Sequence, residues 1–166
     1  MVKESYMFGL FKKKKADHNI YAPVNGRSME LENVKDEVFS SKMLGDGIAF
    51  TPDENTVYIP CQGTITTIAD TKHAFGIQME NGAEVLVHVG LDTVNLNGEG
   101  FEVLKKVNDK VTPGDEVLKI DLDVMKEHDI DLTTMLILSN DNGCKYKIED
   151  SGKDVKAGTD VVITAL

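Results

Sequence analysis

The chain has 166 residues, of which 41% are hydrophobic, so it can form one domain with a real core but not two domains of ordinary size. Its 18 basic and 28 acidic side chains leave a net charge of −10, which argues against nucleic acid as a partner. No apolar run approaches the roughly 20 residues that span a bilayer, and two cysteines without metal-ligand or C-x-x-C spacing are typical of a reducing compartment. The sequence therefore predicts a single cytoplasmic domain.

Residues 1–17 differ in composition from the rest of the protein. The apolar cluster Met7–Phe11 precedes the basic run Lys12–Lys15, a combination that suits weak contact with anionic lipid, although composition favours a solvated, disordered tail over such contact. Without residues 1–15, the remainder has 13 basic and 27 acidic side chains, a net charge of −14. We therefore predict a flexible basic tail over 1–17 and one β domain over 18–166 whose surface attracts cationic partners.

From residue 20 onward, short β-branched segments alternate with Gly, Pro, Asn and Asp clusters. This spacing predicts an all-β fold, an antiparallel sandwich or barrel of short strands. Brief helical turns are expected at Val34–Phe39 and Leu122–Glu127. The expected strands, in sequence order, are Ile20–Ala22, Ser28–Leu31, Gly47–Thr51, Thr56–Ile59, Gly63–Ala69, Ala74–Met79, Glu84–Val89, Glu102–Lys105, Glu116–Asp121, Met135–Leu138 and Val161–Thr164.

Two internal echoes occur in the same order in both halves of the sequence. The Pro-x-x-Gly pattern of Pro23–Gly26 recurs at Pro60–Gly63, and the Val-x-x-Gly-x-x-Val pattern of Val111–Val117 recurs at Val155–Val161. Each pattern places a turn residue between two strand-like segments. The echoes indicate a duplicated β unit.

The clearest hairpin signal is Asn81–Gly82, flanked by two β-like segments. If these two residues form the whole loop, His88 pairs with Phe75 and His73 pairs with Gly90. In that register the two histidines share one sheet face, with Cα atoms about 7 to 8 Å apart. A four-residue loop keeps this arrangement, whereas a three-residue loop breaks it.

The same register would surround both histidines with apolar side chains, which lower the pKa of an imidazole. A neutral ring nitrogen is a nucleophile at physiological pH. The second ring could then donate a hydrogen bond to an anionic oxygen in the transition state. The neighbours expected on that face are Phe75, Ile77, Met79 and Leu86.

Other interpretations of the two histidines remain open at this point. They could be structural residues, or they could hold zinc together with Asp92, although no H-E-x-x-H spacing supports a metal site. His18 and His128 are expected at the surface. No nucleotide-binding or kinase motif is present, so a phosphoryl group would have to come from another protein.

Several longer motifs occur in order along the sequence, namely Ala22–Pro23 followed by Gly26, Asp36–Phe39, Gly45–Ala49, Thr71–Phe75, Val87–Val94 and Gly98–Phe101. Together they resemble the glucose-type enzyme IIA family of the bacterial phosphoenolpyruvate-dependent sugar phosphotransferase system, over about residues 20–165. The resemblance implies a β-sandwich that accepts a phosphoryl group from the phosphocarrier HPr. It also implies that the group passes to a cysteine of a IIB domain, without a metal or nucleotide cofactor.

The resemblance also implies roles for individual residues. His88, in the H-x-G-[IL]-D-T-V motif, would be phosphorylated on Nε2, and His73 would contact the phosphoryl oxygens. Thr71 would orient the histidines, and the Gly90 carbonyl is our candidate acceptor for Nδ1–H of His88. These four residues are the predicted catalytic set.

Members of the family dock their partners on an apolar depression with an acidic rim. The matching apolar residues here are Val38, Phe39, Ile48, Phe75 and Leu86, and the rim residues are Asp36, Glu84 and Asp92. The resemblance names neither the sugar nor any regulatory target. Two other functions are kept as alternatives: a zinc-dependent hydrolase on a related duplicated β fold, and a regulatory binding module without catalysis.

Overall fold

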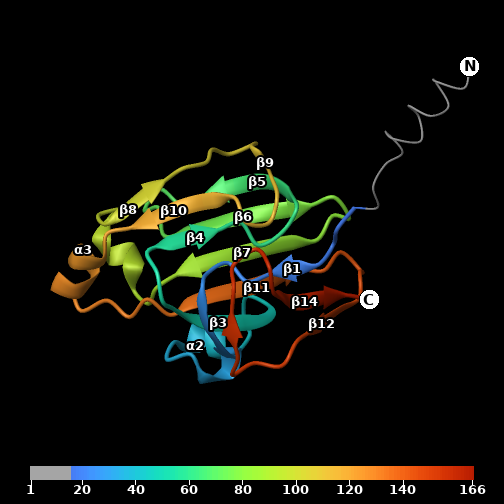
Figure 1. Ribbon diagram of the computed structural model, residues 1–166, viewed down its shortest axis with the longest axis horizontal. Coiled ribbons are helices and arrows are strands. Elements are labelled where there is room, and N and C mark those ends of the chain that lie inside the picture. Colours follow the sequence, from blue (N-terminus) through green and yellow to red (C-terminus); the bar gives the residue numbers. More distant parts are fainter. Residues whose placement is uncertain (1–15) are drawn as a thin grey trace, which may run out of the picture.

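The computed structural model describes residues 16–166, which form a layered arrangement of short antiparallel strands with brief helical turns (Figure 1). The predicted all-β fold is thereby confirmed. Most of the predicted tail, and with it the proposed lipid contact, lies outside the described residues. Asp17, the last residue of that tail, already contacts the fold, because its carboxylate accepts a hydrogen bond from the Tyr21 hydroxyl.

The largest sheet has eight strands in the order β13-β2-β3-β11-β7-β6-β5-β9, and every neighbouring pair is antiparallel. The central strand β11 is buried over four consecutive residues, whereas its neighbour β7 alternates buried and half-buried residues, so the sheet is covered on both faces at β11 and more thinly on one face at β7. The bounds are β2 (Gly26–Glu30), β3 (Asp46–Pro52), β5 (Gly63–Ile68), β6 (Ala74–Met79), β7 (Glu84–Val89), β9 (Lys110–Val111), β11 (Thr134–Asn140) and β13 (Asp154–Val155).

Two smaller sheets, ordered β1-β14-β12 and β4-β10-β8, complete the β structure. Both contribute apolar side chains to the same main core as the large sheet, for example Val57, Leu118 and Ile163. The core therefore lies between the large sheet and the two small ones. The bounds are β1 (Ile20–Tyr21), β4 (Thr56–Tyr58), β8 (Phe101–Val103), β10 (Glu116–Ile120), β12 (Tyr146–Ile148) and β14 (Val161–Ala165).

A second, smaller apolar cluster lies on the other face of the large sheet. It joins side chains of β3 and β11, including Ala49 and Met135, to Leu31, Val34 and Phe39. The latter three belong to the segment that contains the 3-10 turn η1 (Leu31–Asn33) and the helix α2 (Glu37–Ser40), which lies beneath β3 in Figure 1. This segment therefore covers part of the outer face of the sheet.

Every predicted strand overlaps an observed one, whereas β9, β12 and β13 were not predicted. Each of these three is only two or three residues long, so it has no alternating pattern. The helix α3 (Leu122–Glu127) has the predicted bounds, and the turn expected at Val34–Phe39 is present as α2 but starts three residues late, because a break separates it from η1. The break occurs because the Asp36 side chain accepts from the Val38 N–H and caps a new helix there. A further 3-10 turn, η2 (Thr93–Leu96), was not expected.

The two Pro-x-x-Gly echoes face each other in the fold. Tyr21 donates its backbone N–H to the Pro60 carbonyl, and Tyr58 donates its own to the Pro23 carbonyl, both at 2.7 Å. Tyr21 and Tyr58 hold equivalent places, each two residues before the echoed proline. The reciprocal bonds give the fold an approximate two-fold symmetry, as a duplicated unit predicts.

The Val-x-x-Gly-x-x-Val echoes obey the same symmetry. The N–H of Gly114 donates to Ile59, and that of Gly158 donates to Ala22, both at 3.0 Å. The backbones of the two glycines pack so closely that there is no room for a side chain. A Cβ added at Gly158 would lie only 2.6 Å from the Gly114 Cα. Gly158 also has φ +68°, a left-handed conformation that favours glycine.

We expect Gly158→Ala to lower the free energy of unfolding by about 3 kcal/mol, because left-handed strain and backbone crowding act together. Gly152→Ala is the matched control: Gly152 has φ +81° but no atom within 4 Å of an added Cβ. Gly152→Ala should lower the free energy of unfolding by about 1 kcal/mol, because only the left-handed strain acts there. Urea denaturation of both variants checks this difference. Equal losses would mean that the Gly114 contact adjusts without cost.

Candidate functional site

The β6–β7 hairpin carries the two candidate histidines in a register that differs from the predicted one. Ala74 pairs with His88 and Gln78 with Glu84, and the Met79 N–H closes the loop on the Ala83 carbonyl. The loop therefore has three residues, 80–82, and the predicted register was wrong by one position. A slip of one residue exchanges the two faces of a strand.

This slip changes the neighbours of His88. Phe75, Ile77 and Met79 lie in the main core with the β7 valines, not beside His88 as expected. His88 projects from the opposite face of the sheet, the face that carries Leu86. A site built on His88 could therefore form only on the outer face of the sheet, next to the smaller apolar cluster.

The structure nevertheless brings the two imidazoles together. His73 precedes β6 and follows Lys72, whose φ of +66° turns the backbone. The His73 carbonyl accepts a hydrogen bond from the Val89 N–H at 2.8 Å. The imidazole ring of His73 meets that of His88 edge-on, with ring centroids 4.7 Å apart. The two rings therefore meet because the left-handed backbone at Lys72 turns His73 toward His88. They do not meet through the alternation of side chains along β6 and β7.

The ring of His73 is held by Thr71. Thr71 Oγ1 lies 2.8 Å from His73 Nδ1. Burial lowers the pKa of His73, and a contact with the Thr71 backbone opposes this shift in part. When the hydroxyl donates to Nδ1, the ring proton is on Nε2, where it can be donated to an anion.

His88 is enclosed on one side by Phe39 of α2, with ring centroids 4.8 Å apart. Burial, followed by the neighbouring His73, lowers the pKa of His88 to about 4. Nδ1 of His88 is shielded from solvent. The Gly90 carbonyl is near enough to raise the pKa of His88 in part, but its contact with Nδ1 lacks hydrogen-bond geometry. Nε2 is not shielded in this way. At neutral pH His88 therefore presents an uncharged, accessible nitrogen, as a nucleophile requires.

Sequence reasoning did not single out Thr93, which supports the turn after His88. Thr93 is fully buried, and its hydroxyl donates to the Val89 carbonyl at 2.6 Å. Its Cγ2 would lie 2.4 Å from a Cβ added at Gly90, which has φ +81°. Thr93 therefore supports the backbone turn at Gly90, and its hydroxyl also lies 3.5 Å from the Gly90 carbonyl. The signal was present, because Thr93 belongs to the motif that contains His88.

The predicted apolar docking residues separate into two groups. Val38 is 42% exposed, Leu86 is half-buried, and Phe39 is buried but touches His88. Ile48 and Phe75 are wrong as surface residues, since both lie in the main core with at most 3% of their surface exposed. Their strands present these side chains to the opposite face of the large sheet.

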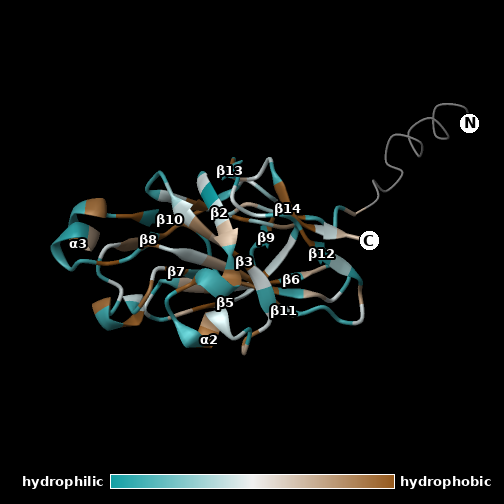
Figure 2. Ribbon diagram, turned by 90° about the horizontal axis from the view of Figure 1, so that it is seen from below, coloured by the Kyte–Doolittle hydropathy of each residue, from teal (hydrophilic) through white to brown (hydrophobic). Residues whose placement is uncertain are grey.

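Two exposed apolar residues were missed. Met43 is 72% exposed and Leu44 is 39% exposed, and both lie in the turn after α2. Together with Val38 they expose apolar side chains around α2, where part of the ribbon has the brown colour of hydrophobic residues in Figure 2. In the sequence these two apolar residues stand between Lys42 and Gly45, outside every predicted strand and helical turn.

The predicted acidic rim surrounds this surface in part. The carboxylates of Asp36 and Asp92 both raise the pKa of His88, which places them within electrostatic range of its ring. Glu84 projects from the same face of β7 as His88, four residues away. All three side chains are at least partly exposed.

Within residues 16–166, no group of three or more His, Cys, Asp or Glu side chains is arranged to hold a metal ion. The zinc alternative would need such a third ligand. His128 lies at the surface 3.3 Å from Glu99, as expected, whereas His18 is half-buried. In the same range, no helix is long and apolar enough to cross a membrane.

A model of the family described as "phosphoenolpyruvate-dependent sugar phosphotransferase system, EIIA 1" matches residues 18–144. The protein belongs to this family. It is therefore a phosphotransferase component, a phosphohistidine carrier of the sugar phosphotransferase system.

Two relatives extend this comparison. The "PTS system glucoside-specific EIICBA component" of Staphylococcus carnosus (strain TM300) is 44% identical over 134 residues, which are 81% of this protein. The match spans only 19% of that relative's length. The solved structure of glucose permease IIA from Mycoplasma capricolum matches with a TM-score of 0.80 and 40% identity, covering 87% of this protein and 94% of the other.

Proposed function

We propose that His88 Nε2 accepts the phosphoryl group from HPr and passes it to a cysteine of a IIB domain. The observation that carries this proposal is the pairing of a neutral, accessible His88 with a second imidazole 4.7 Å away, in a family of phosphohistidine carriers. Two free cysteines fit a reducing, cytoplasmic setting.

The transfer needs no cofactor in this scheme. The Nε2 lone pair of His88 forms the new N–P bond while the N–P bond of phosphorylated HPr breaks, and the electron pair returns to the HPr imidazole. The ring proton of His88 stays on Nδ1, next to the Gly90 carbonyl. In the second step a IIB thiolate forms an S–P bond and the His88–phosphorus bond breaks. Positioning and charge stabilisation supply most of the rate in such transfers.

His73 would act on the transferring group without bonding to it. The Thr71 hydroxyl at Nδ1 directs the Nε2–H of His73 outward. From the edge-on position beside His88, that N–H can donate to a phosphoryl oxygen whose charge grows in the transition state. Thr71 is then a positioning residue.

We infer that partners dock on the surface around α2. Val38, Met43 and Leu44 supply exposed apolar area in and after α2, whose Phe39 contacts His88, and the rim carboxylates would face basic side chains of the partner. The names of the two relatives mention a glucoside and glucose. We propose a permease for a sugar of this class as the final user of the phosphoryl group.

The direct test is to incubate the protein with phosphoenolpyruvate, enzyme I and HPr and to map acid-labile phosphate by mass spectrometry. Label on His88 supports the proposal. Label on another residue, or none with HPr of the same organism, contradicts it.

Replacing the rim carboxylates by amides tests the docking surface. In the double variant Asp36→Asn, Glu84→Gln, association with HPr should slow about tenfold at low salt, because steering depends on charge, and the difference should shrink at high salt. Stopped-flow measurement of phosphoryl transfer at both salt concentrations checks this. Glu102→Gln, an exposed charge on β8 outside this surface, is the control. Equal rates for both variants at low salt would remove the steering role.

A further inference from the structure

Four asparagines in this protein are followed by glycine, at Asn25, Asn81, Asn97 and Asn142. In such a pair the glycine nitrogen can attack the asparagine Cγ, because no side chain hinders its approach. A bond forms between that nitrogen and Cγ to give a succinimide, the Cγ–Nδ2 bond breaks, and Nδ2 leaves as ammonia with the amide proton. One water then opens the ring to aspartate or isoaspartate. The sequence alone gives the four sites equal reactivity.

The fold restrains two of these asparagines through both ends of the side-chain amide. Asn25 Nδ2 donates to Glu54, and its Oδ1 accepts the Ala157 N–H at 2.8 Å. Asn81 Nδ2 donates to the Tyr146 hydroxyl at 2.9 Å, and its Oδ1 accepts the Ala83 N–H. Neither amide can rotate toward the following nitrogen without breaking these bonds.

The third site is restrained through both reacting groups. Asn142 Nδ2 donates to the Asn81 carbonyl at 3.0 Å. The nucleophile is also occupied, since the Gly143 N–H donates to Asp141 Oδ1 at 2.9 Å. Attack at Asn142 therefore requires at least two hydrogen bonds to break.

Asn97 differs from the other three. It is exposed, and within residues 16–166 its side-chain amide has no hydrogen-bond partner. The Gly98 N–H has no partner in that range either. Asn97 has φ +53° at the end of η2, and the atoms nearest to the vacant Cβ position of Gly98 all belong to the flexible side chain of Lys72.

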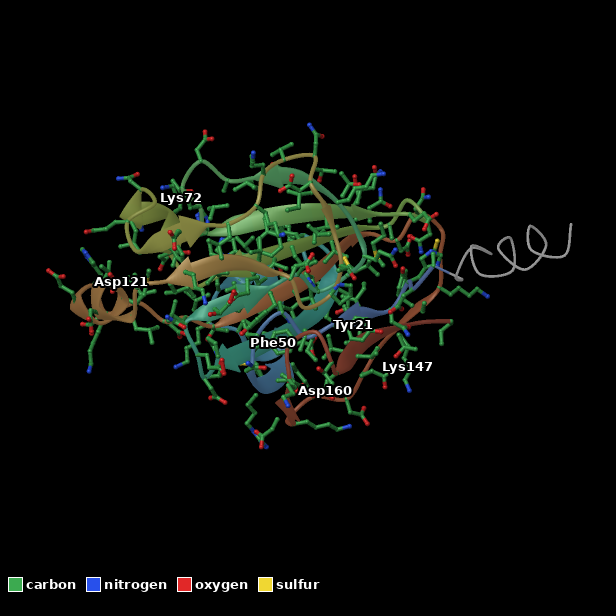
Figure 3. The ribbon with its side chains drawn as sticks, turned by 45° about the horizontal axis from the view of Figure 1, so that its top comes forward. Tyr21, Phe50, Lys72, Asp121, Lys147 and Asp160 are labelled. Carbon is green, nitrogen blue, oxygen red and sulfur yellow. The ribbon has the colours of Figure 1, made fainter. Side chains whose placement is uncertain are left out.

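We propose that Asn97 is a site of spontaneous deamidation and that the folded protein reacts there before it reacts at the other Asn-Gly pairs. Lys72, which precedes His73, extends toward this loop (Figure 3). Deamidation would place a new carboxylate beside Lys72 and close to Glu99. The histidine-bearing end of the molecule would thereby gain negative charge. This proposal does not depend on the role of His88.

The test is to incubate the full-length protein at mildly alkaline pH and to follow all four sites over time by peptide mapping with fragmentation that distinguishes isoaspartate. We expect Asn97 to react at least about five times faster than each of the others, the factor that one intramolecular hydrogen bond supplies. In concentrated guanidinium chloride the four rates should become similar. A faster reaction at any other pair in the folded protein, or equal rates at all four, would overturn the proposal.

Two variants separate the reaction from general changes in stability. Asn97→Gln should remove the main charge variant on anion exchange, because the larger ring forms slowly. Tyr146→Phe removes the hydroxyl that holds Asn81, so the rate at Asn81 should rise about five-fold while the rate at Asn97 stays unchanged. If Tyr146→Phe leaves the Asn81 rate unaltered, hydrogen bonding to the amide does not control reactivity, and the argument for Asn97 fails.

Discussion

Replacing His88 by alanine is expected to abolish phosphorylation by HPr, with a loss of at least about 10⁴-fold in rate, because the variant lacks the nucleophile itself. No second imidazole can replace it: His73 is tied through Nδ1 to Thr71 and is 6% exposed. The measurement is the rate of acid-labile phosphate formation at saturating HPr. Phosphate on His73 in the variant, at a rate near that of the unaltered protein, would contradict the assignment.

The variant must be compared with one that keeps the side-chain volume, since alanine would leave a gap beside Phe39. His88→Gln fills most of that space and should be equally inactive. Urea denaturation of both variants shows whether the fold is kept. If His88→Gln were active, the imidazole would not be the acceptor.

The low pKa of His88 can be checked without any partner protein. Because burial favours the neutral ring, the His88 nitrogens should titrate near pH 4 in NMR spectra, and not near the ordinary value of about 6.5. His88 takes up its proton near pH 6.5 in the unfolded protein but only near pH 4 in the folded one. The free energy of unfolding should therefore fall as pH drops from 6.5 toward 4. His88→Gln should lose this part of the pH dependence. Titration near 6.5 would mean that the ring is solvated and that desolvation does not keep it neutral.

The strands were predictable because short β-branched segments are separated by clusters of Gly, Pro, Asn and Asp. Ala74–Met79 and Glu84–Val89 agree with β6 and β7 at both ends. The register between them was not predictable from Asn81–Gly82, because loop length depends on which turn the neighbouring contacts favour. Here Asn81 binds Tyr146, which comes from a distant part of the sequence. The hydrogen bond between Asn81 and Tyr146 therefore accompanies a three-residue loop, whereas the Asn-Gly pair by itself indicates a two-residue loop.

The error in register explains one of the two docking residues that were wrong. Phe75 followed from the face assignment in the hairpin, whereas Ile48, on β3, followed from the family resemblance alone, and both project into the main core. His73 was placed beside His88 although the parity argument for it fails in the observed register. The left-handed Lys72 that turns His73 toward its partner has no sequence signature, since lysine rarely adopts a positive φ. The motif thus located the pair more reliably than the strand geometry did.

His73→Gln is expected to leave His88 able to accept phosphate but to slow transfer in both directions by about 10² to 10³-fold, the usual cost of losing one transition-state donor. Thr71→Val should have a smaller effect, about five-fold, because it removes only the hydrogen bond that orients the ring. Rapid-quench measurement of transfer from HPr and to a IIB domain checks both variants. The distinguishing readout is kcat, which should fall while KM for each partner stays the same.

This result would separate a transition-state role from a structural one. If His73 only supported the fold, His73→Gln would lower the urea midpoint and raise KM, since the edge-on contact with His88 would be lost. If His73 itself carried the phosphoryl group, the variant would show no label at all. Unchanged transfer rates in both directions would remove His73 from the mechanism. Because the geometry places its ring beside His88 with Nδ1 already engaged by Thr71, we expect a fall in kcat alone.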